Sequence, residues 1–267
     1  MKNNVETNVK NKIKHAFLLA AGYGNRMETY TKEVPKPLLK VGGVPLIVYS
    51  LYTLKKLGIE NVVVNTHYLA DQIENFLKST SKELPFNISI SHESEILGTA
   101  GALKKAIVEK RVPEDQNFFL LNTDVILQPP SGIDKEMDDE LFPVSKANLP
   151  PETLSCLYLK EKDQTNKEKG WNLNQKKQLH LNTKHGQFYY IGFSIVNPLL
   201  LSALPPNQTS ELGPLWADAS KKNRLMGEPY RSSVILCGNK IQYENIKNTI
   251  PEFLQNDSDF LDFCEWL

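Results

Sequence analysis

The stretch LLAAGYGNRMETYTKEVPKPLLKVGGVPLI, residues 18–47, decides how the rest of the chain is interpreted. It begins as a short apolar strand and runs directly into a glycine-rich turn that is followed by cations, among them Arg26 and Lys36. Gly22 and Gly24 allow backbone angles closed to other residues and let N–H groups approach a phosphate or a base closely. Arg26 and Lys36 place positive charge beside that turn. Together these features favour the binding of a nucleoside triphosphate.

Other interpretations explain less of this loop. A dinucleotide-binding loop requires a third glycine where this chain has Met27, and no acidic residue closes a second strand at the expected distance. A Walker A loop requires GxxxxGK followed by Ser or Thr, and that pattern is absent. A tight turn with surface cations accounts for the glycines alone but not for the PKP sequence at 35–37.

The first half of the chain alternates apolar strand-like runs with helical patterns. Segments of helical spacing separate successive apolar runs, which indicates a β-α-β-α-β-α-β order. The expected strands are 16–21, 61–65, 87–91 and 118–121, and the expected helices are 45–57, 69–79 and 100–110. Strands that are apolar on both faces predict a doubly wound, mostly parallel α/β sheet flanked by helices. Ligands of such sheets bind beyond the carboxyl ends of the strands, where the strand order reverses.

The organisation changes along the chain. Residues 1–14 form a polar extension, and residues 15–250 are interpreted as one domain with a nucleotide-binding half (15–128) and a smaller, mixed acceptor-binding half (129–250). Residues 251–267 form an amphipathic segment whose apolar face either docks on the chain's own core or meets a partner subunit.

Composition excludes several classes of protein. Lys+Arg 31 and Asp+Glu 31 give a formal net charge of +0, so nothing predicts nucleic acid or membrane binding. The three cysteines are far apart and form no CxxC pair, which predicts neither a disulfide framework nor a zinc site and favours a reducing cytoplasm.

The opening motif resembles that of the sugar-nucleotide pyrophosphorylases, which are sugar-1-phosphate nucleotidyltransferases with a doubly wound fold. Their LAAGxGxRM and PKPL elements correspond here to Leu19, Ala20, Ala21, Gly22, Gly24, Arg26 and Met27, followed by Pro35, Lys36, Pro37 and Leu38. Two further matches follow in order, HESEILGTAGAL at 92–103 and NTDVI at 122–126. The resemblance implies a nucleotide site that comprises Leu19, Ala20, Ala21, Gly22, Gly24, Asn25, Glu93, Gly98, Thr99, Ala100 and Asn122.

In this family the residue five before the LGTAG glycine contacts the base, and here it is Glu93. A carboxylate at that position resembles the mannose 1-phosphate guanylyltransferases and the muramic acid 1-phosphate uridylyltransferases. A carboxylate can accept hydrogen bonds from the N1–H and exocyclic amine of guanine, whereas uracil offers one N–H donor. We therefore expect GTP or UTP, with a preference for guanine; the other interpretation of Glu93 is an exposed acid at the end of a strand.

The resemblance also implies a metal site and an acceptor site. Asp124 corresponds to a Mg²⁺-binding aspartate, and Arg26, Lys36 and Asp124 to the catalytic set. The second metal-binding aspartate of relatives corresponds to Leu236, two residues before Gly238, and leucine cannot bind magnesium. No ExKP lysine occurs, and the segment nearest to the family's NAG element places Tyr190 and Gly192 at the acceptor.

The sequence therefore predicts a Mg²⁺-dependent nucleotidyltransferase that joins a nucleoside triphosphate to a sugar 1-phosphate. A phosphocholine-like acceptor stays open, and so does an oligomer formed through the C-terminal segment. The alternative is a catalytically silent family member that binds a nucleotide or nucleotide sugar and regulates a partner. Leu236 and Tyr190 motivate this alternative, whereas the complete set of Arg26, Lys36 and Asp124 favours catalysis.

Overall fold

The computed structural model describes residues 12–128, 149–163, 170–182 and 185–265. Much of the predicted polar extension, most of the charged stretch after residue 128 and the last two residues of the amphipathic segment lie outside these ranges. No helix in the described ranges combines the length and the apolar character that crossing a bilayer requires.

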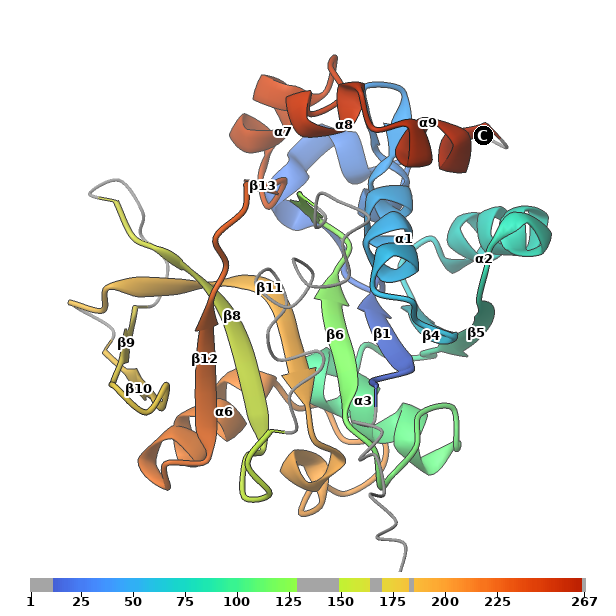
Figure 1. The fold of residues 1–267 in the computed structure, drawn as a ribbon. Helices are drawn as coiled ribbons and strands as arrows, with labels where there is room; N and C mark the ends of the chain where they lie inside the picture. Colours follow the sequence, from blue (N-terminus) through green and yellow to red (C-terminus); the bar gives the residue numbers. More distant parts are fainter. Residues whose placement is uncertain (1–11, 129–148, 164–169, 183–184, 266–267) are drawn as a thin grey trace, which may run out of the picture.

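The first half forms the parallel part of a nine-stranded sheet (Figure 1). Its strands are β1 (His15–Leu19), β4 (Asn61–Thr66), β5 (Asn87–His92) and β6 (Phe118–Asn122), joined by α1 (Leu46–Lys56), α2 (Ala70–Thr80) and α3 (Gly98–Val108). Shorter elements are η1 (Asn25–Thr31), η2 (Lys36–Leu38), β2 (Lys40–Val41), β3 (Val44–Pro45), η3 (Ser81–Glu83) and β7 (Val125–Leu127). All four strands and all three helices expected from hydrophobic periodicity are confirmed.

The strand order reverses at β1. β1 pairs in parallel with β4 on one side and with β6 on the other, and β5 lies beyond β4. The chain thus moves outward through β4 and β5 and then returns to the far side of β1, which places the switch point between β1 and β6. A ligand site is expected at this point, beyond the carboxyl ends of the two strands.

The second half extends the sheet with a change of direction. Its elements are β8 (Ser155–Glu161), β9 (Trp171–Leu173), β10 (Leu179–Leu181), β11 (Phe188–Val196), η4 (Pro198–Leu201), α6 (Leu212–Lys221), β12 (Leu225–Pro229) and β13 (Val234–Leu236). β11 pairs antiparallel with β6 and β8, while β12 pairs in parallel with β8. This mixed half agrees with the predicted architecture.

Two apolar clusters cover the two faces of the sheet. Ala16 and Leu18 of β1 belong to the cluster that contains α1 and α2, whereas Phe17 belongs to the cluster that contains α3 and α6. This alternation follows from the two-residue period of a strand with both faces buried. The doubly wound α/β prediction is therefore confirmed.

The described part of the C-terminal segment packs against α1 (Figure 1). Its helices are α8 (Glu252–Gln255) and α9 (Ser258–Cys264), and α7 (Lys240–Ile246) precedes the segment. Phe260 is fully buried and stacks on Tyr49 at 5.3 Å between ring centroids. Tyr52 donates to Asp257 Oδ2 at 2.7 Å, so polar and apolar contacts together join this segment to α1 of the same chain.

Candidate active site

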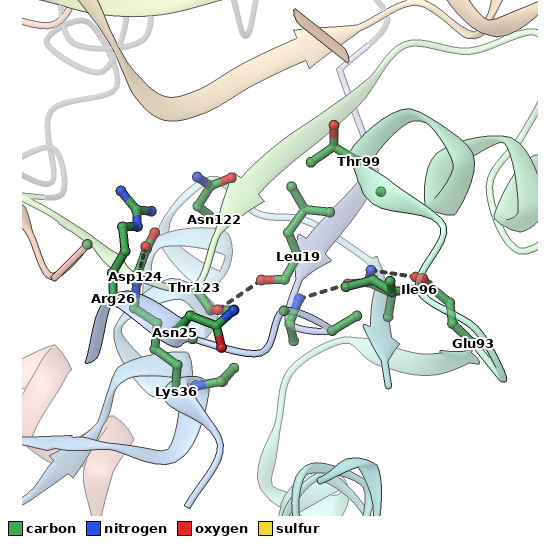
Figure 2. Close-up of a pocket in the computed structure, with 18 of the residues that line it drawn as sticks. Leu19, Asn25, Arg26, Lys36, Glu93, Ile96, Thr99, Asn122, Thr123 and Asp124 are labelled. Carbon is green, nitrogen blue, oxygen red and sulfur yellow. Dashed lines mark hydrogen bonds and ion pairs between the residues drawn. The ribbon is translucent and has the colours of Figure 1, made fainter. Parts of the chain in front are cut away.

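A pocket opens at the carboxyl ends of the four parallel strands (Figure 2). Most of its lining comes from the carboxyl ends of β1, β4 and β6 and from the loops that follow β1, β5 and β6, as expected for a ligand site at a switch point. The lining residues are Leu19, Ala20, Ala21, Gly22, Gly24, Asn25, Arg26, Lys36, Pro37, Asn65, Glu93, Ile96, Gly98, Thr99, Asn122, Thr123, Asp124, Glu211 and Gly238.

Almost all residues predicted for the site lie in this lining. The three that do not are Ala100, Tyr190 and Gly192. Among the lining residues, Pro37, Ile96 and Thr123 lie within the quoted motifs but were not predicted for the site, and Asn65 and Glu211 lie outside these motifs. The structure thus brings together loops that are far apart in the sequence, and the role of each residue stays a prediction.

The two loop glycines differ in their conformational requirement. Gly24 has a φ of +67°, and a Cβ atom added there would lie 2.8 Å from Thr31 Cγ2. Gly22 has no φ in the left-handed region, and no atom lies within 4 Å of its added Cβ. The expectation that both positions need special backbone angles is therefore wrong for Gly22. At Gly22 the absence of a side chain instead leaves the pocket open.

Lys36 and Asp124 form an ion pair in the pocket. Their side chains are 12% and 18% exposed, so water screens the pair only partly. Lys36 lies in the short turn η2, where Pro35 and Pro37 restrict the backbone. Asp124 follows β6, and its carbonyl accepts from the Cys237 N–H at 2.8 Å. Two separate motifs of the sequence thus place opposite charges side by side.

Arg26 lies at the same end of the pocket as this pair (Figure 2). It has no hydrogen bond or ion pair to any residue in the described ranges, and its side chain is exposed. Its loop is held from α7 instead: Lys240 pairs with Glu28 at 2.7 Å. Glu28 has φ 55° and ψ −116°, an unfavourable conformation for a residue with a side chain. Arg26, which has no partner in the described ranges, is therefore carried by a loop with an unfavourable backbone conformation at Glu28. The ion pair with Lys240 of α7 holds this loop in place.

A second contact from α7 braces the same loop. Tyr30 hydrogen-bonds Glu244, and Lys247 Nζ donates to the Tyr30 hydroxyl at 2.9 Å. Hydrogen bonds from Lys247 and Tyr30 lower the pKa of the Glu244 carboxyl below its usual value. Glu244 is consequently held in its charged form, in which it can accept from both partners.

Glu93 is buried at the other end of the pocket. It is 1% exposed, and its Oε1 accepts from Asn65 Nδ2 at 2.7 Å while Oε2 accepts from the Leu97 N–H at 2.8 Å. The interpretation of Glu93 as an exposed acid at the end of a strand is therefore wrong. Each carboxylate oxygen has a second lone pair, so Glu93 can also accept from a ligand in the pocket.

The second half of the chain caps the N-terminus of α3. Ser210 O accepts from the N–H groups of Ala100 at 2.9 Å and Gly101 at 3.1 Å, and Glu211 Oε2 accepts from the Thr99 N–H at 3.3 Å. Ala100 is fully buried and its N–H is taken, so the expected contact between Ala100 and a nucleoside does not fit this arrangement. Glu211 was not among the residues predicted for the site. The signal that could have drawn attention to it is TSE at 209–211, which precedes an apolar helical pattern and indicates the start of a helix.

The two predicted acceptor residues, Tyr190 and Gly192, are not among the lining residues of the pocket. Gly192 has a φ of +84°, and a Cβ atom added there would lie 3.0 Å from Asn122 Nδ2, so this glycine makes room for a pocket residue. Tyr190 contacts Ser194 Oγ at 3.3 Å and Trp216 edge-on. Burial raises the pKa of the Tyr190 hydroxyl, which stays neutral. Neither residue lines this pocket, and their role at the acceptor stays a prediction.

The residues present fit a metal ion that arrives with its substrate. Leu236 pairs with Val125 and packs on the core beside Asp124, whereas Gly238 lines the pocket. No cluster of three His, Cys, Asp or Glu side chains suited to a metal occurs in the described ranges. Mg²⁺ often takes one or two carboxylates and completes its shell with water and phosphate oxygens. Asp124 alone meets that lower requirement.

Known proteins match the half of the chain that supplies most of the pocket. The model of the nucleotidyl transferase family matches residues 15–138. This part of the chain is therefore similar to the nucleotidyl transferases. The resemblance inferred from the motifs is thereby confirmed.

Two relatives differ in how much of the chain they cover. The mannose-1-phosphate guanylyltransferase catalytic subunit beta of Xenopus tropicalis is 39% identical over 116 residues, which are 43% of this chain and 32% of that protein. The chain thus spans about a third of the length of this relative. The subunit of the same name from Dictyostelium discoideum is 28% identical over 252 residues, covering 90% of this chain and 67% of that protein.

Solved structures share the fold of this chain over both of its halves. A putative glucose-1-phosphate thymidylyltransferase from Bacillus anthracis superposes with a TM-score of 0.71 at 19% identity, covering 92% of this chain and 98% of that one. The inositol-1-phosphate CTP transferase from T. maritima gives a TM-score of 0.69 at 14% identity, with coverage of 96% and 98%. Both halves of the chain therefore belong to one known architecture.

Proposed function

We propose that the protein is a Mg²⁺-dependent nucleotidyltransferase that joins a nucleoside triphosphate to a sugar 1-phosphate and releases pyrophosphate. One observation carries this proposal: the Lys36–Asp124 pair and Arg26, which has no partner in the described part of the chain, lie together at the switch point of the sheet. Two cations at one end of a pocket provide the charge that a triphosphate and a leaving pyrophosphate need.

The reaction requires positioning and charge neutralisation. An oxygen of the acceptor phosphate attacks the α-phosphorus in line, and the bond from that phosphorus to the bridging oxygen breaks. The pyrophosphate leaves with the electron pair of that bond, and no covalent intermediate with the protein forms. Lys36 and Arg26 stabilise the negative charge on the triphosphate and on pyrophosphate. Mg²⁺, when bound, neutralises phosphate charge, and Asp124 is the carboxylate that would hold it.

Glu93 supports guanine as the preferred base. Asn65 and the Leu97 N–H fix the orientation of its carboxylate, and each oxygen keeps a lone pair for a ligand. Guanine offers two adjacent donors to such a group and uracil one. The guanylyltransferase names of the relatives over the first half point the same way, so GTP with mannose 1-phosphate is the first pair to test.

The test is pyrophosphate release from the purified protein with Mg²⁺. GTP, UTP, CTP, ATP and dTTP are each combined with a panel of sugar 1-phosphates and with phosphocholine. We expect turnover with GTP and a sugar 1-phosphate, and its loss in folded Lys36→Ala and Asp124→Asn variants. Variants that keep the parent's folded spectrum and its rate contradict the proposed catalytic roles.

A second function, regulation of a partner by a silent nucleotide binder, rests on Leu236. Leu236 stands where the resemblance places the second metal-binding aspartate, so in the described ranges Asp124 is the carboxylate left for the metal at that position. The two functions differ in the Mg²⁺ dependence of triphosphate binding. A catalyst binds triphosphate and metal together, whereas a product sensor prefers the nucleotide sugar in the absence of metal.

The setting of this activity follows from two further features. Cys156 and Cys237 are buried free thiols and Cys264 is a third free cysteine, which supports a reducing cytoplasm.

The apolar face of α9 is used within the chain, so an oligomer would need another surface, and Ile241 on α7 is 75% exposed.

A further inference from the structure

Glu211 is a charged residue that the second half of the chain contributes to the pocket. It precedes α6, its side chain is exposed, and it reaches across to the N-terminus of α3. Gly238 is the other lining residue from beyond residue 128, and it has no side chain. In the described ranges, Glu211 is therefore the point where a side chain of the second half can contact a substrate in this pocket.

One oxygen of Glu211 is fixed and the other is free. Oε2 accepts from Thr99 Oγ1 at 2.7 Å, and Thr99 Oγ1 itself accepts from the Leu212 N–H at 2.9 Å. No donor in the described ranges bonds to Oε1. A Cβ atom on Gly98 would lie 2.7 Å from Oε1, so the missing side chain at Gly98 leaves room for this oxygen. The carboxylate is thus held in one orientation with an unused acceptor.

The charges divide the pocket into two ends. Arg26 and Asp124 lie on one side of Leu19 in Figure 2, and Thr99, the partner of Glu211, lies on the other. A carboxylate repels the phosphates, which belong near Arg26 and Lys36. The part of the substrate near Glu211 is therefore not anionic. Hydroxyl groups are neutral donors that a carboxylate oxygen accepts.

We propose that Glu211 Oε1 accepts a hydrogen bond from a hydroxyl group of the substrate and that Glu211 thereby determines specificity for a hydroxyl-bearing ligand. This inference rests on the proposed function, because it assumes that the pocket holds a nucleotide and a sugar phosphate. Two groups carry the required chemistry, the ribose of the nucleotide and the acceptor sugar.

The experiment compares hydroxyl and deoxy ligands in the parent, Glu211→Ala and Thr99→Val. GTP is compared with 2′,3′-dideoxy-GTP, and mannose 1-phosphate with its monodeoxy analogues, by kcat/KM. Thr99→Val is the matched control because it removes the hydroxyl that holds Oε2 and leaves the Glu211 carboxylate in place. Equilibrium binding of GTP, dideoxy-GTP, GDP and GDP-mannose gives the same comparison without turnover.

In one of the two comparisons, the nucleotide or the sugar phosphate, we expect the kcat/KM of the parent to be at least about tenfold higher for the hydroxyl ligand than for the deoxy ligand, as for a site built around a hydroxyl. We expect Glu211→Ala to abolish that preference. Thr99→Val should keep most of it. If Glu211→Ala lowers kcat/KM by the same factor for the hydroxyl and the deoxy ligands, with the nucleotides and with the sugar phosphates alike, Glu211 only holds the N-terminus of α3. That result would overturn the inference. If turnover is absent but Glu211→Ala still abolishes the preference in binding, the proposed function fails and the inference stands.

Discussion

The side-chain nitrogen of Asn65 donates to Glu93 Oε1 at 2.7 Å, and this bond connects the end of β4 to the loop that follows β5. Asn65 Oδ1 also accepts from the Ala20 N–H at 2.7 Å, and Glu93 Oε2 accepts from the Leu97 N–H at 2.8 Å. Asn65 is 3% exposed, so these groups have little access to water as a substitute partner. One amide therefore sets the distance between the glycine loop and the loop before α3.

Replacing Asn65 by leucine should weaken both the fold and nucleotide binding. Asn65→Leu leaves the Ala20 N–H and Glu93 Oε1 without their partner, and we expect a loss of about 2–3 kcal/mol in the free energy of unfolding. Asn61→Leu on the same strand is the matched control, because its amide bonds at the surface to Asn87. Denaturant titration and the Kd for GTP measure the two effects. An Asn65→Leu variant that binds GTP like the parent contradicts the assigned role.

Local sequence predicts the strand that carries Asn65 but not this contact. The run of valines at 62–64 is apolar enough to indicate a buried strand. The contact with Glu93 depends on the parallel register of β4 and β5, in which Thr66 lies opposite His92. Register between strands separated by a helix is set by packing across the sheet, and a pattern within one strand does not contain it.

Local motifs also explain which site residues the sequence predicted and which residues it missed. Lys36 and Asp124 are 88 positions apart, and each was identified from its own motif, so their pairing needed only the predicted sheet. Glu211 and Lys240 lie in the second half, where the motifs end, and act through single side chains on loops of the first half. No periodicity marks such contacts, because one long-range hydrogen bond leaves no repeating pattern in the sequence.

The two loop glycines should respond differently to alanine. Gly24→Ala places a Cβ against Thr31 and forces a left-handed backbone on alanine, so we expect a loss of about 1–3 kcal/mol in the free energy of unfolding. Gly22→Ala meets no neighbouring atom and should keep stability within about 1 kcal/mol of the parent while weakening GTP binding. Thermal unfolding and GTP titration of both variants test this. Equal destabilisation of the two would show that the glycines share one role.

The brace from α7 should affect catalysis more than stability. Lys240→Met removes the 2.7 Å contact to Glu28, and the strained loop that carries Arg26 can then relax. We expect the KM for GTP to rise several-fold while the melting temperature stays close to that of the parent, since exposed ion pairs contribute little to folding. Lys222→Met, which breaks the exposed pair with Asp218 on α6, is the matched control and should leave KM unchanged. A KM that is the same in both variants rules out a positioning role for Lys240.

The C-terminal segment should be essential for the stability of the domain. Phe260 is fully buried against Tyr49 and Tyr52, and Phe260→Ala should lower the free energy of unfolding by about 3–5 kcal/mol. Leu261, the next residue, is 43% exposed, and Leu261→Ala should change stability by about 0.5 kcal/mol or less. Denaturant unfolding of the two variants measures the difference. Similar small losses in both would mean that α9 does not dock on α1 in solution.

Protonation of His15 should lower stability in mild acid. Burial, opposed by nearby Glu60, lowers the pKa of this imidazole in the folded state, and its Nδ1 atom is buried with no partner in the described ranges. The unfolded chain keeps a pKa near 6.5, so as the pH falls below that value it takes up the proton more readily than the folded chain. The free energy of unfolding therefore falls with pH until the folded His15 is protonated too. In His15→Asn, the drop in unfolding free energy between pH 7.5 and pH 5.5, measured by urea titration, should be smaller than in the parent. An equal drop in both proteins would assign the acid sensitivity to other groups.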